Sequence, residues 1–353
     1  MLTEGICKEK QEKEMLDRYG REIDYLRISI TDRCNLRCRY CMPKDIETVA
    51  MEEILSYEEI VSIAEAAAAL NISKLRITGG EPLVRRGVSR LISMLKGIRG
   101  IETVSITTNG ILLSDMLDEL ISAGLDGINL SLDTLDPEKY RLITGFDRLR
   151  DVLKGMDKAL EKGIPLKINA VSLDIDKMCG TKEERAGGEL PYDVEALTGL
   201  AVENKVDVRF IELMPIGNGK GFPGISHDRL IPLILDHYGG MERDDLNRGN
   251  GPAVYYRNDR FAGRLGFISA IHGKFCDFCN RIRLTSTGYL KSCLCYDTGV
   301  SVKEILRGET KAGDREKALI KAIEKCIQMK PGSHSFSQGE KITERHVMSA
   351  IGG

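Results

Sequence analysis

The sequence lacks the features that would place it in a membrane or in a disordered class. No run of apolar residues approaches the roughly 20 that cross a bilayer, and no low-complexity tract interrupts the 353 residues. The first 20 residues carry charges of both signs and contain no apolar core of the kind that a secretion signal needs. We therefore expect a cytoplasmic globular protein, with no membrane contact and with residues 1–20 as a lead-in to the folded part.

A dominant charge of one sign is also missing. Lysine and arginine number 51 against 53 aspartates and glutamates, which leaves a formal net charge of −2. Such a chain has no overall field that attracts nucleic acid, so we expect no nucleic-acid partner. An anionic substrate would have to be held by a local cluster of arginine and lysine side chains.

Cysteine, in contrast, is abundant, with ten residues. Disulfides are disfavoured in a reducing compartment, where clustered cysteines more often bind metal or take part in chemistry. Seven of the ten fall in two groups, which are Cys34, Cys38 and Cys41 near the start and Cys276, Cys279, Cys293 and Cys295 near the end. The grouping predicts two metal-binding or catalytic sites.

Residues 21–214 alternate between strand-like and helix-like patterns. The predicted strands are 24–31, 74–78, 103–107, 127–132, 166–173 and 206–213, and the predicted helices are 57–70, 88–97, 113–123, 149–162 and 194–204. Repeated strand–helix alternation implies a parallel sheet with crossover helices. We expect an α/β fold in which six such units form a partial (β/α)6 barrel like a TIM barrel, with the chemistry at the carboxyl ends of the strands.

Beyond residue 214 this alternation ends. Short strand-like pieces at 253–256, 264–271 and 282–285 flank the second cysteine group, and helical patterns follow at 302–307 and 315–329. We therefore place a smaller α+β domain at residues 215–353. The segment Asp174–Pro191 is charged and rich in glycine, which predicts a long loop.

The first cysteine group follows a predicted strand and has the spacing n, n+4, n+7. Three thiolates in such a loop can converge on one 4Fe–4S cluster and leave one iron open for another ligand. Arg33, Arg37 and Arg39 would favour the thiolate state. The spacing alone leaves a three-cysteine zinc site, or thiols that are neighbours by chance, as alternatives.

Further residues make this region similar to the radical S-adenosylmethionine superfamily. Tyr40 precedes the last cysteine, and a strand runs into Gly79-Gly80-Glu81-Pro82, which resembles the superfamily's glycine-rich element. Glycine there allows a close approach of the backbone to the methionyl amine, because it has no Cβ. The resemblance implies a 4Fe–4S cluster on Cys34, Cys38 and Cys41 that binds S-adenosylmethionine, with Ser131 and Asp133 near the cofactor.

The second group contains three cysteines in the pattern C-x2-C-x13-C, which are Cys276, Cys279 and Cys293. A fourth ligand from Cys295 or His272 would make a closed zinc site, and this alternative stays open. Arg281 and Arg283 alternate along a predicted strand, so their guanidinium groups should share a face and form a phosphate clamp. In a strand, Cys293 and Cys295 would lie about 7 Å apart, which argues against Cys295 as a ligand of the same cluster.

Six motifs in order resemble the GTP 3′,8-cyclase family of molybdenum-cofactor biosynthesis, the MoaA family. They lie between Tyr19 and Gly353 and read LRITGGEPLVRR, ITTNG, INLSLDT, FIELMPIG, FCDFCNRIRLTSTGYLKSCL and a terminal IGG. The resemblance implies conversion of GTP to (8S)-3′,8-cyclo-7,8-dihydroguanosine 5′-triphosphate, the first step of that pathway, with S-adenosylmethionine and two 4Fe–4S clusters. It further implies an electron donor, a homodimer, and a downstream cyclic pyranopterin monophosphate synthase that receives the product.

The resemblance also assigns roles to individual residues. The second cluster would be bound by Cys276, Cys279 and Cys293, and S-adenosylmethionine would be contacted by Tyr40, Gly80, Ser131 and Met214. GTP would be contacted by Arg27, Arg76, Thr107, Lys167, Arg281 and Arg283, with Lys74 and Arg209 as further cations around the triphosphate. The tail residues Gly352 and Gly353 would reach the active site and take part in radical formation.

Two other interpretations compete with this one. The first is a different radical S-adenosylmethionine enzyme with an auxiliary iron–sulfur cluster, for which the Arg281 and Arg283 pair would be unnecessary. The second is a binding module stabilised by metal, which predicts four ligands at each site and no glycine-rich element. The sequence disfavours both interpretations.

Overall fold

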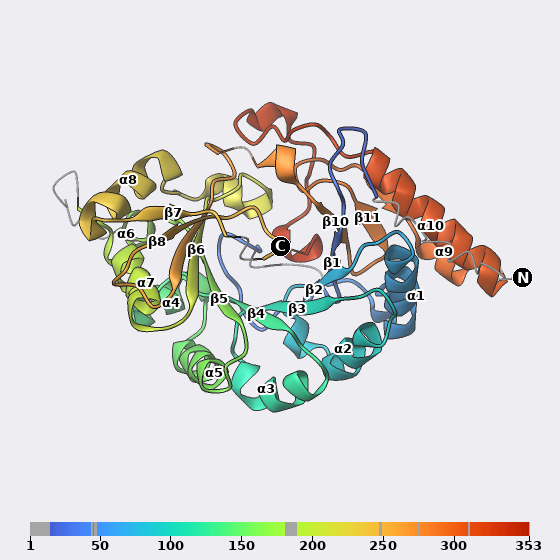
Figure 1. Ribbon diagram of the computed structural model, residues 1–353, viewed down its shortest axis with the longest axis horizontal. Helices are drawn as coiled ribbons and strands as arrows, with labels where there is room; N and C mark the ends of the chain where they lie inside the picture. The colour runs from blue at the N-terminus through green and yellow to red at the C-terminus, as the bar shows by residue number, and fades with distance from the viewer. Residues whose placement is uncertain are drawn as a thin grey trace, which may run out of the picture.

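The computed structural model describes residues 15–43, 45, 48–180, 189–246, 249–273, 275–309 and 311–352. Its strands form one 12-stranded sheet in the order β12-β11-β10-β1-β2-β3-β4-β5-β6-β9-β8-β7 (Figure 1). The strands from β10 to β9 in this order run parallel to one another. Their bounds are β1 Tyr25–Ser29, β2 Lys74–Thr78, β3 Thr103–Thr108, β4 Gly127–Ser131, β5 Leu166–Val171, β6 Asp207–Ile211, β9 Arg264–Ile268 and β10 Arg281–Leu284. The expected α/β fold with a parallel, barrel-like sheet is confirmed.

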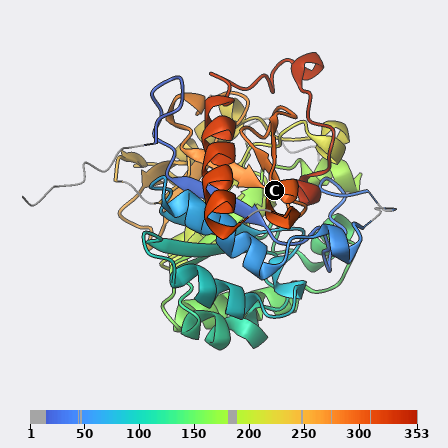
Figure 2. The ribbon, with the colours of Figure 1, turned by 90° about the vertical axis from the view of Figure 1, so that its right-hand side faces the viewer.

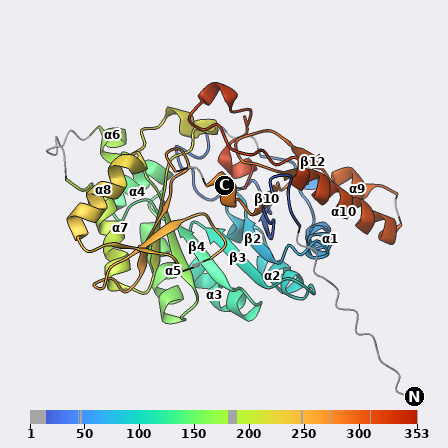
Figure 3. The same cartoon turned by 45° about the horizontal axis from the view of Figure 1, so that its top comes forward.

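Helices cover the outer face of this curved sheet, as Figures 1 and 3 show for α1, α2, α3 and α5. The described helices are α1 Tyr57–Ala68, α2 Val88–Lys96, α3 Leu113–Ser122, α4 Pro137–Thr144, α5 Leu149–Glu161, α6 Ile175–Cys179, α7 Tyr192–Glu203, α8 His227–Tyr238, α9 Lys303–Arg307 and α10 Ala312–Gln328. Alternate strand residues such as Leu26, Ile77 and Ile106 are fully buried apolar side chains of the main core. Successive side chains of a strand point to opposite faces, so the residues between them point into the barrel.

The helices begin and end where local chemistry allows. Ser56 accepts a hydrogen bond from the Glu59 N–H, and the Glu59 carboxylate accepts one from the Ser56 N–H, which forms a capping box before α1. The structure corrects the loop expected at Asp174–Pro191, because α6 follows Asp174, which caps it by accepting from the Lys177 N–H. The helix ends at Gly180, and residues 181–188 of that predicted loop lie outside the described residues.

The C-terminal part of the chain extends both edges of the sheet. Strand β9 pairs with β6, and β8 (Val254–Arg257) and β7 (Glu242–Asp244) continue from it. At the opposite edge β10 pairs with β1, and β11 (Tyr289–Lys291) and β12 (Gly299–Ser301) continue from it. The C-terminal strands thus complete the sheet of the first part, and the domain boundary at residue 214 remains a prediction.

Residues 269–280 connect the two edges. They leave the carboxyl end of β9 and reach the amino end of β10, which lies against β1. Twelve residues span at most about 40 Å, so the sheet must curl until its edges face each other. Cys276 and Cys279 lie in this crossing segment.

The chain after α10 turns inward. Helix α10 packs against α1 at the outside of the barrel (Figure 2), whereas the end of the chain lies at the centre of the ring of strands (Figure 1). Gly352 has φ +73°, and a Cβ there would lie 3.2 Å from the Ser29 Cβ and 3.3 Å from the Thr78 Oγ1. This C-terminal segment builds a second buried cluster from Ile216, Ala270, Leu294, Cys295, Phe336, Ile342 and Ile351.

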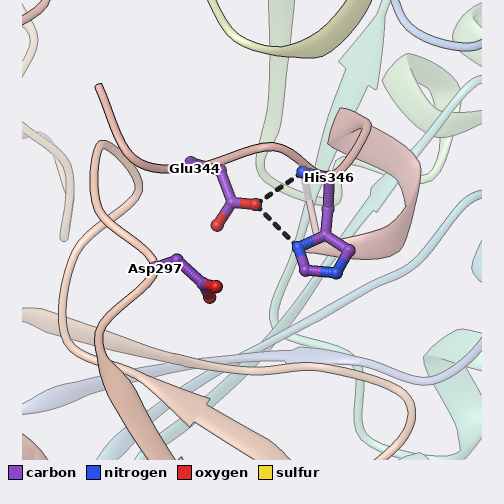
Figure 4. Close-up of side chains that lie close together, drawn as sticks. All are labelled: Asp297, Glu344 and His346. Carbon is purple, nitrogen blue, oxygen red and sulfur yellow. Dashed lines mark hydrogen bonds and ion pairs between the residues drawn. The ribbon is translucent and has the colours of Figure 1, made fainter. Parts of the chain in front are cut away.

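A buried ion pair anchors the C-terminal segment to β11. The side chains of Lys291 and Glu344 are exposed by only 1% and 0%, and their charged groups are in contact. Figure 4 shows Glu344 with Asp297 and His346, whose N–H and Nδ1 lie 2.7 and 2.8 Å from the Glu344 Oε1. Ligand atoms of these three residues lie within 4.8 Å of one another, as in a metal site. However, the Lys291 ammonium lies against both carboxylates, so the protein itself supplies the positive charge there.

We expect Glu344→Gln to destabilise the folded chain by roughly 3 kcal/mol, because it leaves the Lys291 ammonium buried without its main partner. Urea unfolding of the full chain measures this loss. The double variant Lys291→Met with Glu344→Leu should recover most of it, since apolar side chains then fill the site. A double variant as unstable as the single one would contradict this account.

The decrease in the free energy of unfolding caused by Glu344→Gln should depend on pH. Burial raises the pKa of Glu344, but the hydrogen bond and charge of Lys291 outweigh burial and hold that pKa below its ordinary value. The stabilisation is therefore fully present above the unfolded-state pKa of about 4.3 and is lost as pH falls through the folded-state pKa. The difference between wild type and Glu344→Gln should shrink over that acidic range.

Candidate functional site

One cavity of about 310 Å³ lies inside the barrel, and each of the parallel strands contributes to its lining. Most of the site residues expected from the sequence line it. They are Cys34, Cys38, Cys41, Cys276, Cys279 and Cys293, then Tyr40, Gly80, Ser131 and Met214, and finally Arg27, Thr107, Arg281 and Arg283. The barrel thus brings together residues that are more than 250 positions apart in the sequence.

The two cysteine groups lie at opposite ends of the barrel axis. Cys34 follows β1 at its carboxyl end, whereas Cys279 precedes β10, whose first residue, Arg281, pairs with Tyr25 at the amino end of β1. Strand β11 runs antiparallel to β10, so Cys293, two residues after β11, returns to that same end. The four steps from Tyr25 to Ser29 span about 13 Å, so the cavity separates the two groups by at least a strand's length.

The first cysteine loop is held by the glycine-rich element after β2. The Gly80 N–H donates to the Thr31 carbonyl at 2.7 Å, and the Glu81 N–H donates to the Arg33 carbonyl at 2.8 Å. A Cβ at Gly80 would lie 2.4 Å from the Arg33 oxygen, which no side chain permits. The close approach in this structure is therefore to the cysteine loop, and contact with a methionyl amine remains a prediction.

Two carboxylates flank this loop, the buried Glu81 and the half-buried Asp133. Burial raises the pKa of Glu81 to about 7, although the N–H of Asn109 and the Thr108 hydroxyl donate to it. Burial likewise raises the pKa of Asp133 to about 6, and the Val171 N–H and Tyr40 hydroxyl donate to its two oxygens. Tyr40 and Asp133 thus hold each other beside Cys38 and Cys41.

In this structure the three thiols of neither cysteine group lie close enough together to bind one zinc ion. Two thiolates bound to one zinc ion at 2.3 Å cannot be more than about 4.6 Å apart. Among the described residues, neither cysteine group has its three thiols all within 4.8 Å of one another. Burial and the neighbouring cysteines raise the pKa of Cys38 and Cys41, that of Cys41 to about 12, so stable thiolates there require a cationic group between them.

The second cysteine group receives hydrogen bonds from around it. The His334 N–H donates to the Cys276 sulfur at 3.2 Å, and the Lys330 ammonium lies 3.4 Å from the Cys279 sulfur. Burial raises the pKa of Cys279, but the charges of Lys330 and Arg281 outweigh it and lower that pKa to about 7. Such donors are typical of sulfur atoms that carry negative charge.

The fourth ligands considered for a zinc site do not join this group. Cys293 and Cys295 lie in a loop after β11 and not in a strand, so the expected separation along a strand does not apply. The Cys295 thiol packs in the second buried cluster, accepts from the Ser335 N–H at 3.4 Å, and does not line the cavity. His272 instead bonds the Glu212 carboxylate through Nδ1. Each group therefore presents three cysteines to the cavity.

Arginines form a layer between the two groups. The register pairs Arg27 with Arg283 on one side and with Arg76 on the other. Burial and the charge of Arg283 lower the pKa of Arg27, and burial and the charge of Arg281 lower that of Arg283 to about 10. Within the described part of the chain, no carboxylate pairs with Arg76, Arg281 or Arg283, and the Arg281 Nε and Nη2 are buried without hydrogen-bond partners. The guanidinium groups of Arg281 and Arg283, which face no carboxylate of the described residues, can therefore bind an anion.

Four predicted cations lie on the same inward face but outside the cavity lining. They are Lys74, Arg76, Lys167 and Arg209. Lys74, the first residue of β2, pairs with Asp24; Lys167 lies 3.5 Å from Asp207; and Arg209 donates to Asn129. These four cations occupy the amino ends and middles of their strands and not the carboxyl ends.

The end of the chain enters the same cavity region. The Arg283 Nη1 donates to the Gly352 carbonyl at 2.8 Å, and the Ser349 N–H donates to the Cys41 sulfur. Gly353, which was predicted with Gly352, lies outside the described residues. The segment before Gly352 thus touches both the first cysteine group and the arginine layer.

Several site residues had no assignment from the sequence. Asn169 lines the cavity two positions after Lys167, and strand alternation could have indicated it. Glu212, within the FIELMPIG motif, accepts from the Ile271 and His272 N–H groups and so fixes the start of the crossing segment. Lys330 and His334 follow α10, where no sequence pattern marks them.

Comparison with known proteins agrees with this geometry. Residues 28–179 match the Radical SAM superfamily, and residues 206–336 match Molybdenum Cofactor Synthesis C. The GTP 3′,8-cyclase of Clostridium perfringens strain 13 is 41% identical over 341 residues, which are 96% of this chain and 100% of that protein. That of Petrotoga mobilis is 40% identical over 344 residues, again 96% and 100% of the two chains.

A solved structure shares the fold. Streptococcus suis SuiB bound to S-adenosylmethionine superposes with a TM-score of 0.58 at 17% identity. The match covers 86% of this chain, which spans 65% of the SuiB chain. With its two matched regions in order and near-complete relatives, the chain belongs to the GTP 3′,8-cyclase family of radical S-adenosylmethionine enzymes.

Proposed function

We propose that this protein is the GTP 3′,8-cyclase that converts GTP to (8S)-3′,8-cyclo-7,8-dihydroguanosine 5′-triphosphate in molybdenum-cofactor biosynthesis. The observation that carries the proposal is the cavity with an open cysteine triad at each end and an arginine layer between them, in which Arg281 and Arg283 face no carboxylate of the described part of the chain. A radical enzyme without a nucleotide substrate would have no need for that layer, and a closed metal module would have four ligands at each group.

The residues present fit two 4Fe–4S clusters and S-adenosylmethionine. Cys34, Cys38 and Cys41 would hold the first cluster, and Cys276, Cys279 and Cys293 the second. When bound, these groups supply a 5′-deoxyadenosyl radical at one end of the barrel and an open iron for the guanine at the other. Tyr40, Gly80, Ser131 and Met214 line the cavity near the first group and would hold the methionyl and adenosyl parts.

The protein's own contribution is to position GTP between these ends. Arg281 and Arg283 project from β10 beside the second group and would bind phosphate oxygens, with Arg27 and Arg76 in the neighbouring positions. The buried Thr107 hydroxyl, which has no hydrogen-bond partner among the described residues, is available to the substrate. Lys74, Lys167 and Arg209 lie on the inward face of their strands outside the cavity lining and would add positive charge around the triphosphate. Such fixed cations stabilise a polyanion without reorganisation.

The C-terminal tail would act beside the reacting atoms. Gly352 lies against β1 and β2, and Arg283 holds its carbonyl. We propose that Gly352 and Gly353 take part in radical formation. No described helix is both long and apolar enough to cross a membrane. We further propose a cytoplasmic homodimer that takes electrons from a separate donor and passes its product to a cyclic pyranopterin monophosphate synthase.

The proposal predicts that anaerobically reconstituted protein forms 5′-deoxyadenosine and an isomer of GTP when S-adenosylmethionine, dithionite and GTP are supplied. Cys34→Ser should abolish both products, because it removes one of three ligands of the first cluster. Mass spectrometry of the nucleotides measures both. 5′-Deoxyadenosine without a GTP-derived product would support another radical enzyme, and neither product from fully loaded protein would support a metal-stabilised module.

Arg281→Ala should raise the dissociation constant for GTP by about 10- to 100-fold, since a charge-assisted hydrogen bond contributes about 1.5–3 kcal/mol. Equilibrium binding to the reconstituted Cys34→Ser protein measures this without turnover. Arg257→Ala is the matched control, because Arg257 is also a strand arginine but is exposed and paired with Glu242. Equal affinities in the two variants would count against a phosphate clamp.

Gly80→Ala should reduce the iron content by about half, because the new Cβ displaces the first cysteine loop and leaves the second group intact. Iron analysis and 5′-deoxyadenosine formation measure the effect. Gly199→Ala provides the control, since a Cβ at Gly199 in α7 meets no atom within 4 Å. Full iron content in Gly80→Ala would show that the loop does not depend on this packing.

A further inference from the structure

Lys330 is a buried lysine beside the second cysteine group. It follows α10 and is only 2% exposed. A buried ammonium is costly unless it is paired, and lysine is therefore almost never fully buried without a partner. Lys291, the other deeply buried lysine described above, obeys this rule through Glu344.

Lys330 has no such carboxylate. Within the described part of the chain, no aspartate or glutamate lies within 4.0 Å of its ammonium, and all of its contacts are accounted for. Those contacts are the Cys279 sulfur at 3.4 Å, the Arg281 carbonyl at 2.7 Å and the Ser292 carbonyl at 3.1 Å. The Cys279 sulfur is thus the one group in contact with Lys330 that can carry a negative charge.

The two carbonyls place Lys330 between the segments that supply the cysteines. Arg281 lies two residues after Cys279, and Ser292 immediately precedes Cys293. Four residues beyond Lys330, the His334 N–H donates to the Cys276 sulfur, and the Cys295 N–H donates to that of Cys293. Each of the three sulfurs therefore has a hydrogen-bond donor, but only Cys279 has a cationic one from outside the arginine layer.

We propose that Lys330 is a positioning residue that supplies the countercharge of the second cluster. The proposal rests on the proposed function, because it requires an iron–sulfur cluster on Cys276, Cys279 and Cys293. Three thiolates give such a cluster a net negative charge, and reduction increases that charge. A fixed ammonium against Cys279 favours the reduced state, because hydrogen bonds to the sulfurs and local charge set the reduction potential.

The test is a potentiometric titration of the second cluster, followed by electron paramagnetic resonance. A full-length background with Cys34→Ser, Cys38→Ser and Cys41→Ser isolates its signal, and the holoenzyme with both clusters is titrated in parallel. In both, Lys330→Met should lower the midpoint potential of the second cluster, and in the holoenzyme that of the first should not move. Lys330→Gln, which keeps N–H donors but not the charge, should also lower the midpoint potential of the second cluster.

Lys325→Met is the matched control, because Lys325 is an exposed lysine of the same helix end. In Lys325→Met the midpoint potential of the second cluster should equal that of the wild type. An unchanged potential in Lys330→Met would overturn the proposal, and so would a wild-type potential in Lys330→Gln, since a hydrogen bond without charge would then suffice.

If neither Lys330→Met nor Lys330→Gln retains the second cluster, iron content in Lys330→Arg decides. If Lys330→Arg retains the second cluster, a positive charge is required there and the proposal is supported. If Lys330→Arg loses the second cluster to the same extent as Lys330→Met, the proposal is overturned. A failure of the proposed function is distinguishable, because wild-type protein would then carry only the iron of the first cluster, or would bind both clusters without acting on GTP.

Discussion

The pairing of β1 with β2 on one side and β10 on the other is the constraint on which the site depends. It aligns Arg283, Arg27 and Arg76 in neighbouring positions of one sheet face. Like charges side by side on a sheet are destabilising, and burial, the main cause of the lowered pKa of Arg27 and Arg283, adds to that cost. On the opposite face of the same strands, Leu26, Ile28 and Leu75 are fully buried, and each such side chain contributes about 1.5–3 kcal/mol. Burial of apolar side chains on the outer face therefore offsets part of the cost of placing arginines side by side on the inner face.

The barrel interior uses positive charge in two ways, and the difference lies in what faces each side chain. Lys74 and Lys291 meet carboxylates of the same chain about 50 residues away, and each pair holds two distant segments together. Arg281 and Arg283 meet no carboxylate in the part of the chain that the structure describes. The first kind of cation is neutralised on folding, whereas the second retains its charge for a bound group.

The sequence predicted the parallel strands β1 to β6 and the six cavity cysteines because those features are local. Strand alternation and cysteine spacing are read within short stretches of sequence, which are eight residues for the first cysteine group and 18 for the second. The pairing of β9 and β10 with opposite edges has no such signal, since β9 pairs with a strand more than 50 residues earlier and β10 with a strand more than 250 residues earlier. Short edge strands such as β7 and β12 have three residues each, too few to show a period.

Buried polar residues were missed for a related reason. Lysine and glutamate are mostly exposed in folded proteins, so neither Lys330 nor Glu344 differs in the sequence from a surface residue. Helix α6 was missed because its charged, glycine-containing surroundings resemble a loop and it has only five residues. The position of Cys295 also depended on a turn after β11 that the spacing of cysteines could not indicate.

The two cysteine groups differ in how much of the chain each needs. Cys34, Cys38 and Cys41 lie within eight residues, and apart from Ser349 the backbone partners of their loop, such as Thr31, Ile143 and Thr144, lie within the first 150 residues. The second group needs β10 seated on β1, the crossing segment in place, and donors from residues 330 and 334. Domains fold progressively from the amino end during synthesis. It follows that the residues of the first group are synthesised well before those of the second, and that the second group can be completed only once the chain has been made beyond residue 334.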